Sequence, residues 1–242
     1  HEIRTPLNGM MGMLQLLLSS GLGGEAEDYA ANAYEASTRL LSLLNDILDF
    51  SRIEAGAVTL APRAFRVGAL FRSVAQVFQL DCRRKGVALN VLVDGDIPES
   101  LVGDEARIRQ ILFNLVGNAV KFTSRAAVTL SAWGRTHPAR PGAFRLYASV
   151  CDTGAGIPDD KVGLVFERFS QVGQGLSRRN EGAGLGLTIV RRLVEMMRGE
   201  LCVDSHFGQG TGMHLALPLG LAEPAAKSGP TRGGGARQAA PV

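Results

Sequence analysis

The stretch Glu105–Phe122, EARIRQILFNLVGNAVKF, predicts a helix with one apolar face and one polar face. Asn114, Asn118 and Lys121 follow one another at spacings of four and three residues, so they share the polar face. Asparagine is a mediocre helix former and Val and Leu surround both copies, so two aligned asparagines need a reason. Their amide oxygens suit Mg²⁺, and a lysine beside them suits phosphate. A solvated polar stripe is the alternative that these three residues alone leave open.

Two glycine clusters lie further along the chain. Asp152-Thr-Gly154-Ala-Gly156 follows a strand-like run, and Gly182-Ala-Gly184-Leu-Gly186-Leu187 opens a helical one. A glycine-rich turn at the start of a helix exposes backbone N–H groups and suits phosphate. An aspartate at the end of a strand can accept a hydrogen bond from a base amine. Either cluster alone is also compatible with an ordinary turn after a strand. The chain contains no GxxxxGK[ST], and its GxGxxA-like run at residues 21–26 follows a helix, which indicates a turn.

Residues 61–219 mix strand-like and helical patterns. We expect helices over 67–83, 105–122 and 185–198, and strands over 87–93, 128–133, 146–151, 201–204 and 213–217. This order predicts an α/β sandwich, with a mixed sheet and its helices on one face.

Residues 1–56 read as two helices with a break at Gly21–Gly24. The apolar residues of the first helix are spaced four, three, four and three residues apart, which makes one seam: Ile3, Leu7, Met10, Leu14 and Leu17. The second helix offers Ala33, Leu40, Leu44, Ile47, Leu48 and Ile53. One hairpin buries too little apolar surface alone, so we expect two copies to form a dimeric four-helix bundle.

The composition excludes several classes of protein. Of the 242 residues, 45% are hydrophobic, and the net charge is +3, which is too balanced to indicate a nucleic-acid or membrane surface. The three cysteines form no CxxC pair, so we expect neither a zinc site nor a disulfide framework. Residues 220–242 are rich in Gly, Ala and Pro and predict a disordered linker. Because the chain begins at His1, we expect a piece of a longer protein, whose targeting signals it would not show.

Taken in order, these motifs resemble those of the sensor histidine kinases, most closely the hybrid type. The opening His1-Glu2-Ile-Arg-Thr5-Pro-Leu-Asn resembles the phospho-acceptor H box. Four further boxes follow in the family's order: the N box Asn114-Leu-Val-Gly-Asn118-Ala-Val-Lys121-Phe-Thr, the G1 box from Asp152, an F box Phe166-Glu-Arg-Phe169 and the G2 box from Gly182. The resemblance covers residues 1–219. It implies a dimerisation and histidine-phosphotransfer domain over 1–60 and a Bergerat-type ATP-binding domain of the GHKL superfamily over 61–219.

The resemblance also implies roles for the site residues. Asp152 would read the adenine amino group, Gly154 and Gly156 would let the backbone approach the base, and Thr211 would support Asp152. Asn114 and Asn118 would hold Mg²⁺ on the ATP phosphates, which Lys121 would contact. For the segment around Thr211, a simple hairpin turn is an open alternative. Phe166 and Phe169 would pack against the base of an ATP lid, or would be plain core aromatics. The lid would span residues 170–181 and would carry Arg178 and Arg179. The residues after it would form its hinge and would cap the next helix at the triphosphate: Gly182, Gly184, Gly186 and Leu187. Asp104, Arg107 and Gln110 would be structural.

His1 would accept the γ-phosphoryl group, since it lies opposite the apolar seam and is expected to be exposed. Glu2 would polarise the imidazole or take its proton, and a response-regulator aspartate in a receiver domain would then receive the phosphoryl group. Thr5, one turn from His1, would support dephosphorylation of that regulator, or would merely shape the helix. The kinase domain would be cytoplasmic, with the parent protein anchored in the inner membrane by an upstream region.

Two other functions stay open. A hydrolysing GHKL ATPase carries a catalytic Glu one turn before the magnesium Asn, where this chain has Asn114. A degenerate signalling scaffold would lack intact nucleotide motifs.

Overall fold

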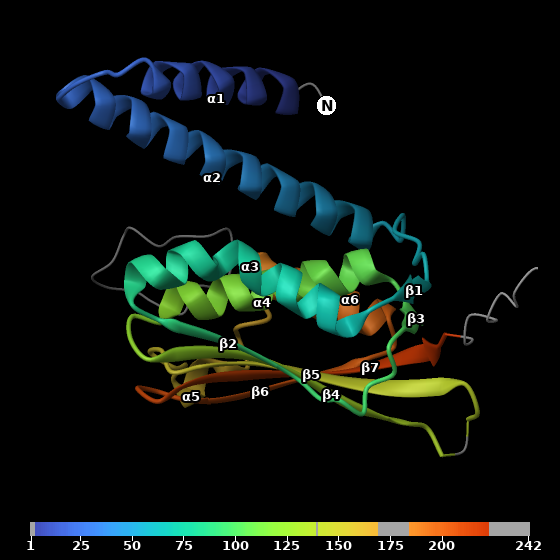
Figure 1. Cartoon of the computed structure of the whole chain (residues 1–242). Helices are drawn as coiled ribbons and strands as arrows, with labels where there is room; N and C mark the ends of the chain where they lie inside the picture. The colour runs from blue at the N-terminus through green and yellow to red at the C-terminus, as the bar shows by residue number, and fades with distance from the viewer. Residues whose placement is uncertain (1–2, 139, 169–183, 223–242) are drawn as a thin grey trace, which may run out of the picture.

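The structure is a computed structural model that describes residues 3–138, 140–168 and 184–222. The helices α1 (Arg4–Ser19) and α2 (Glu25–Glu54) form an antiparallel hairpin. The remaining elements form an α/β unit below α2 (Figure 1). No helix within the described ranges is long and apolar enough to cross a membrane.

Local sequence explains the hairpin. Gly24 has a positive φ of 64° at the end of the turn, directly before α2 begins. The first turn of α2 carries Glu25, Glu27 and Asp28, and acidic side chains at this end stabilise a helix through its dipole. The Arg4 guanidinium donates to Asn45 Oδ1 at 2.7 Å and joins the start of α1 to the second half of α2.

The hairpin leaves much of its apolar surface exposed. Leu7 is buried on α1 and Ala30 on α2. The exposed large apolar side chains of the hairpin include six members of the predicted seams and three neighbours: Ile3, Met10, Met13, Leu16, Leu17, Tyr29, Leu40, Ile47 and Leu48. A single hairpin therefore does not cover its own apolar faces.

The sheet is mixed and has seven strands. They are β1 (Arg63–Phe65), β2 (Ala88–Val93), β3 (Leu101–Gly103), β4 (Ala127–Thr136), β5 (Ala143–Asp152), β6 (Glu200–His206) and β7 (Gly210–Leu221). The order is β1-β3-β7-β5-β4-β2, with β6 on the same edge of β7 as β3 but at the other end. Only β2 and β4 among these strands pair in parallel.

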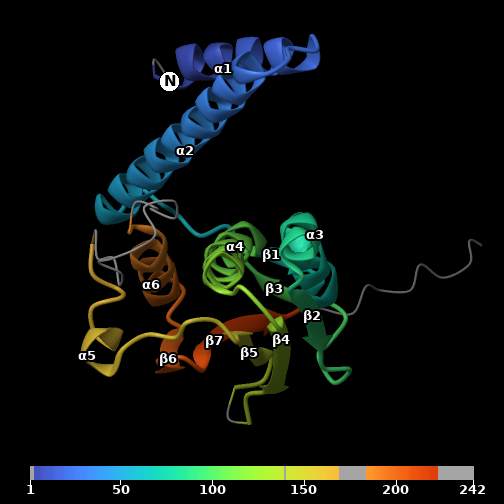
Figure 2. The same ribbon diagram turned by 90° about the vertical axis from the view of Figure 1, so that its left-hand side faces the viewer.

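Three helices cover one face of this sheet, as Figure 2 shows. They are α3 (Val67–Lys85), α4 (Glu105–Phe122) and α6 (Gly186–Met196). The core lies between these helices and the sheet, with fully buried side chains that include Phe71, Ile111, Leu112, Leu146 and Ile189. The predicted sandwich is therefore confirmed, and α4 has the bounds that its sequence predicted.

Three short elements were not predicted: β1, β3 and α5 (Asp159–Val162). With three or four residues each, they are too short to display a period. The last strand is longer than its apolar run indicated, since Gly220 pairs with Val102 and Leu221 with Leu101. These two residues, which we expected in the linker, therefore belong to the sheet.

Candidate functional site

Three polar side chains form a row across the ends of three strands. Asp152 ends β5 and pairs with Thr211 on β7, which pairs with Ser205 on β6. All three lie on the helix-covered face, because they alternate in phase with the buried Val150 and Met213. Asp152 Oδ1 accepts a hydrogen bond from the Gly154 N–H at 2.8 Å. Burial raises the pKa of Asp152, and the N–H groups of Gly154 and Thr211 partly oppose that rise. A half-buried acceptor of this kind suits a donor such as a base amine.

The loop after Asp152 is held against the turn between β6 and β7. The Gly208 N–H donates to the Ala155 carbonyl at 2.7 Å. Gly156 has a φ of +66°, and a Cβ there would lie 2.1 Å from the His206 carbonyl oxygen. Gly210 has a φ of +116°, and its Cβ would lie 2.0 Å from the Asp152 carbonyl oxygen. Glycine at these positions thus permits close approach of the protein's own backbone, in addition to the approach of a base that the sequence suggested for Gly156.

The polar face of α4 begins beside α6 and ends beside this loop. Asn114 Nδ2 donates to the Gly186 carbonyl at 3.3 Å, which leaves the Asn114 amide oxygen available to a cation. Asn118 and Lys121 follow on the same face and are partly exposed. At the far end, a Cβ on Gly154 would lie 2.6 Å from the Phe122 carbonyl oxygen, so the loop packs directly on the end of α4. The fold therefore places Asp152, the two asparagines and Gly186 along one surface.

The donor set fits Mg²⁺ bound together with phosphate. Two amide oxygens are hard ligands, but they are too few for the octahedral shell of Mg²⁺, which keeps waters and substrate oxygens in such sites. Across the part of the chain that the structure describes, no group of three or more His, Cys, Asp or Glu side chains could hold a metal ion. A bound Mg²⁺ would complete its shell with waters and phosphate oxygens.

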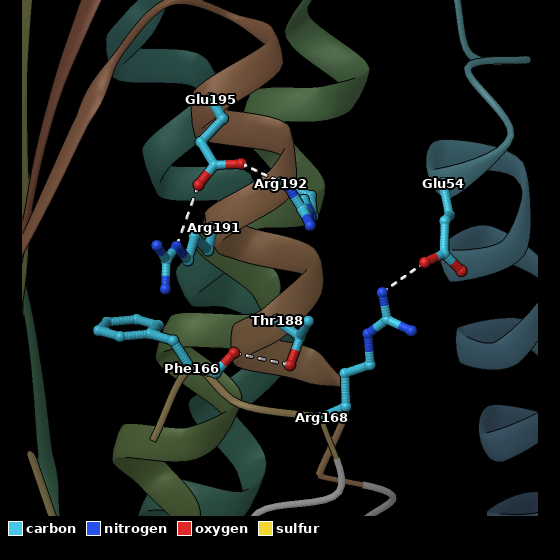
Figure 3. Close-up of polar contacts among 7 residues, drawn as sticks. All are labelled: Glu54, Phe166, Arg168, Thr188, Arg191, Arg192 and Glu195. Atoms are coloured by element: carbon cyan, nitrogen blue, oxygen red, sulfur yellow. Dashed lines mark hydrogen bonds and ion pairs between the residues drawn. The ribbon is translucent and has the colours of Figure 1, made fainter. Parts of the chain in front are cut away.

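The start of α6 closes the side of the site near Asn114. Gly184 has a φ of +67°, and the buried Leu185 anchors the turn before the helix begins at Gly186. Leu187 is half-buried and packs against the core. Phe166 also packs against the core, and its carbonyl accepts the Thr188 hydroxyl at 3.2 Å (Figure 3). Both predicted roles of Phe166, as a core aromatic and as a support near the site, are compatible with this position.

Several predicted residues lie outside the described residues: His1, Glu2, Phe169, Arg178, Arg179 and Gly182, with the whole predicted lid. Thr5 is the second residue of α1 and is exposed.

Side chains of α2 contact the α/β unit at two places. Gln110, one turn before Asn114, donates to Asp49 Oδ2 at 2.8 Å. Arg168 forms an ion pair with Glu54, as Figure 3 shows, and its guanidinium lies 4.7 Å from the centre of the Phe50 ring. Sequence analysis gave no sign of these contacts, nor of Ser205, because each joins segments that are distant in the sequence or adjacent only through strand pairing.

Asp104 has a structural role, as the sequence predicted. Its Oδ1 accepts the Arg107 N–H at 3.1 Å and caps α4, while Oδ2 accepts the Ala61 N–H at 2.9 Å.

Comparison with known protein families agrees with this arrangement. Residues 1–56 match the family described as His Kinase A (phospho-acceptor) domain. Residues 103–221 match the family described as Histidine kinase-, DNA gyrase B-, and HSP90-like ATPase. The two matches cover the helical hairpin and most of the α/β unit.

The chain is also similar to curated sensor proteins. It is 41% identical over 225 residues to the Sensory/regulatory protein RpfC of Xanthomonas campestris pv. campestris, which covers 93% of this chain and 31% of RpfC. It is 39% identical over 225 residues to the Autoinducer 2 sensor kinase/phosphatase LuxQ of Vibrio cholerae, which covers 92% of this chain and 26% of LuxQ. The chain thus spans about a third or less of the length of these relatives.

Among solved structures, full-length ShkA in complex with AMPPNP matches with a TM-score of 0.75 and 38% identity, over 93% of this chain and 45% of ShkA. The Acinetobacter baumannii histidine kinase AdeS shares the fold, with a TM-score of 0.58 and 19% identity over 90% of this chain and 96% of AdeS. With a phospho-acceptor hairpin followed by an ATPase unit of this kind, the chain belongs to the sensor histidine kinase family.

Proposed function

We propose that this chain transfers the γ-phosphoryl group of ATP to His1 and then to an aspartate of a response-regulator receiver domain. The observation that carries the proposal is the surface along α4, where the loop after Asp152 packs on the end of the helix that carries Asn114 and Asn118. On this surface Asp152 would accept from a base amine, and the amide oxygens of Asn114 and Asn118 would face the phosphates. The likeness to proteins named as sensor kinases supports the same reaction.

In this reaction the bond between the γ-phosphorus and the ADP oxygen breaks, and a bond from the γ-phosphorus to a ring nitrogen of His1 forms. The attacking nitrogen carries the lone pair, and the proton on the other ring nitrogen goes to Glu2 or to solvent. Asp152 would fix the base, and Asn114 and Asn118 would hold Mg²⁺, which neutralises charge on the phosphates. Lys121 would contact those phosphates. Catalysis of phosphoryl transfer is largely positioning and charge neutralisation, which are the contributions that these residues can make.

The hydrolysing ATPase is the less favoured function. An enzyme of that kind needs a base at position 114 to activate water. An asparagine amide cannot take a proton, and the Asn114 Nδ2 group is already engaged with the Gly186 carbonyl.

We propose in addition that two hairpins form a four-helix bundle within a homodimer. The exposed apolar side chains of α1 and α2, such as Met10, Leu17 and Ile47, support this, because a bundle would cover them. The boundary between the two domains at residue 60, a linker after Leu221, the hybrid type and anchoring of the parent protein in the inner membrane stay predictions. Thr5 would act in dephosphorylation of the regulator.

The experiment is phosphorylation of the full chain with γ-labelled ATP at saturating Mg²⁺. Asn118→Ala should lose most of the label because one Mg²⁺ ligand is removed, while its fold should be intact by circular dichroism. Asn90→Ala is the matched control, since Asn90 is exposed on β2, away from the site. Undiminished labelling of Asn118→Ala would contradict the assigned role.

A further inference from the structure

The strand β2 forms one edge of the sheet. It lies at the end of the strand order, and β4 is its only strand partner in the part of the chain that the structure describes. Figure 2 shows β2 at the margin of the sheet, below α3. A surface depression follows the second half of the strand, lined by Val91, Leu92, Val93, Asp94, Ser131 and Ala132. Among the described residues, the outer side of β2 is therefore an uncovered edge.

The backbone groups of alternate residues face this open side. The Ala88 N–H donates to the Ala126 carbonyl at 2.8 Å, and the Asp94 N–H donates to the Ala132 carbonyl at 2.9 Å. The even-numbered residues thus bond to β4, and the bonding direction alternates along a strand. The N–H and C=O groups of the odd-numbered residues therefore point away from β4, and these residues are Leu89, Val91 and Val93.

The side chains of this edge lack the usual protection against a further strand. The odd-numbered side chains of β2 pack against the core yet are only half-buried, whereas Val128 and Leu130 on the neighbouring β4 are fully buried. Leu92, on the open face of the sheet, is 59% exposed. The strand reads ALNVLV and contains no charged residue and no proline, which are the features that usually prevent pairing at an edge.

The other edges of the sheet carry that protection. The strand β1 has only three residues and begins with Arg63. The strand β6 carries Glu200, Asp204 and His206, which are all exposed. Among the described strands, a long and uncharged free edge is thus confined to β2.

We propose that β2 is an interface for a second copy of this chain, which pairs antiparallel with it through the same strand. Val91 is the middle one of the three residues whose backbone groups face the edge, so the two-fold axis would pass between the two copies of Val91, perpendicular to the sheet. In this register Val91 lies opposite the partner's Val91, and Leu89 lies opposite the partner's Val93. Each of these pairs exchanges both of its N–H···O bonds.

This register is self-complementary on both faces of the sheet, which is why the occupant is a second copy. On the helix-covered face, every opposing pair is apolar and covers side chains that are half-buried in a single chain. On the open face, Asn90 lies opposite the partner's Leu92, and Ala88 lies opposite the partner's Asp94, so no like charges meet. Because the same patch is used on both copies, the contact closes with two chains and does not propagate. It is separate from the hairpin, so a chain that uses both surfaces forms assemblies of more than two copies.

The test measures the mass of the full chain by light scattering over a range of concentrations. Asn90→Lys/Leu92→Lys changes two exposed side chains and places like charges opposite one another across the interface. This variant should raise the dissociation constant of the association about tenfold. Mixing it with Asn90→Glu/Leu92→Glu should restore the association, because opposite charges then face each other. Val77→Lys/Leu80→Lys is the matched control, since these side chains are 58% and 57% exposed on α3, outside the edge.

Hydrogen exchange tests the register itself. The amides of Leu89, Val91 and Val93 should exchange more slowly at high protein concentration than at low concentration, whereas those of Asn90 and Leu92 are bonded to β4 throughout and should not change. With or without a hairpin bundle, the Lys variant should have a lower mass than the parent chain at the same concentration. Equal masses of the two, growth without limit, or association without this alternating protection would overturn the inference.

Discussion

The close approach of two backbone segments at Gly156 leads to a quantitative prediction for Gly156→Ala. The substitution places a residue with a Cβ at a φ of +66°, which costs about 1–2 kcal/mol. The new Cβ would lie 2.1 Å from the His206 carbonyl oxygen, far inside the ~3.5 Å of a normal contact. Backbone atoms cannot rotate away as a flexible side chain can, so the loop must shift, at a further cost of about 1–3 kcal/mol. Together these terms predict a loss of about 2–5 kcal/mol.

Two other glycines separate the two costs. Gly208 has a φ of +81° but nothing within 4 Å of its added Cβ, so Gly208→Ala should lose only about 1–2 kcal/mol. Gly163 has a φ of −65° and open space, so Gly163→Ala should be stabilised by about 0.4–1 kcal/mol. Urea unfolding at 25 °C measures all three variants, and calorimetry measures ATP affinity, which Gly156→Ala should also weaken because the Asp152 loop moves. Equal losses for Gly156→Ala and Gly208→Ala would refute the close-contact argument.

Two further predictions concern Asp152 and the contact with α2. Burial raises the pKa of Asp152, so the folded state is less stable with the ionised carboxylate than with the protonated acid. The free energy of unfolding therefore falls as the pH rises from the ordinary aspartate pKa through the raised pKa. Asp152→Asn should lose ATP binding, because the acceptor for the base amine is replaced. It should also melt at a higher temperature than the parent chain at pH 7, because no charge is buried, and this gain should disappear below the ordinary aspartate pKa. A lower melting temperature at pH 7 would count against the second expectation. Glu54→Arg and Arg168→Glu should each weaken the hold of α2 on the α/β unit, and the charge-swapped double variant should recover it. The side chains of Glu54 and Arg168 are 51% and 48% exposed, so the ion pair should be weak. A double-mutant cycle of unfolding free energies should give a coupling of about 0.2–1 kcal/mol that decreases in high salt. Zero coupling at low salt would mean that this ion pair does not stabilise the contact.

The elements that carry a long periodic pattern could be predicted from the sequence, and the site depended on one of them. The helix with Asn114 and Asn118 was predicted with its observed bounds, because its apolar face has seven buried residues that mark the period. The short strands β1 and β3 have no period. The pairing of β1 with β3, and of β3 with β7, is a property of the assembled sheet.

The same distinction explains what sequence analysis missed at the site. Asp152 and the glycines belong to local motifs, whereas Ser205 lies beside Thr211 only through the register of β6 with β7, six residues away across a turn. Gln110 was assigned a structural role, but its partner Asp49 lies 61 residues earlier on another helix. Cross-strand and interhelical partners of this kind leave no spacing pattern in one sequence.

His1 is the proposed acceptor of the γ-phosphoryl group, and the most direct test is to locate the label after incubation of the full chain with γ-labelled ATP and Mg²⁺. The label should be stable in base and labile in acid, should be carried by the peptide that contains His1, and should be lost in His1→Gln. Release of inorganic phosphate without labelled protein, or label that persists in His1→Gln, would contradict it.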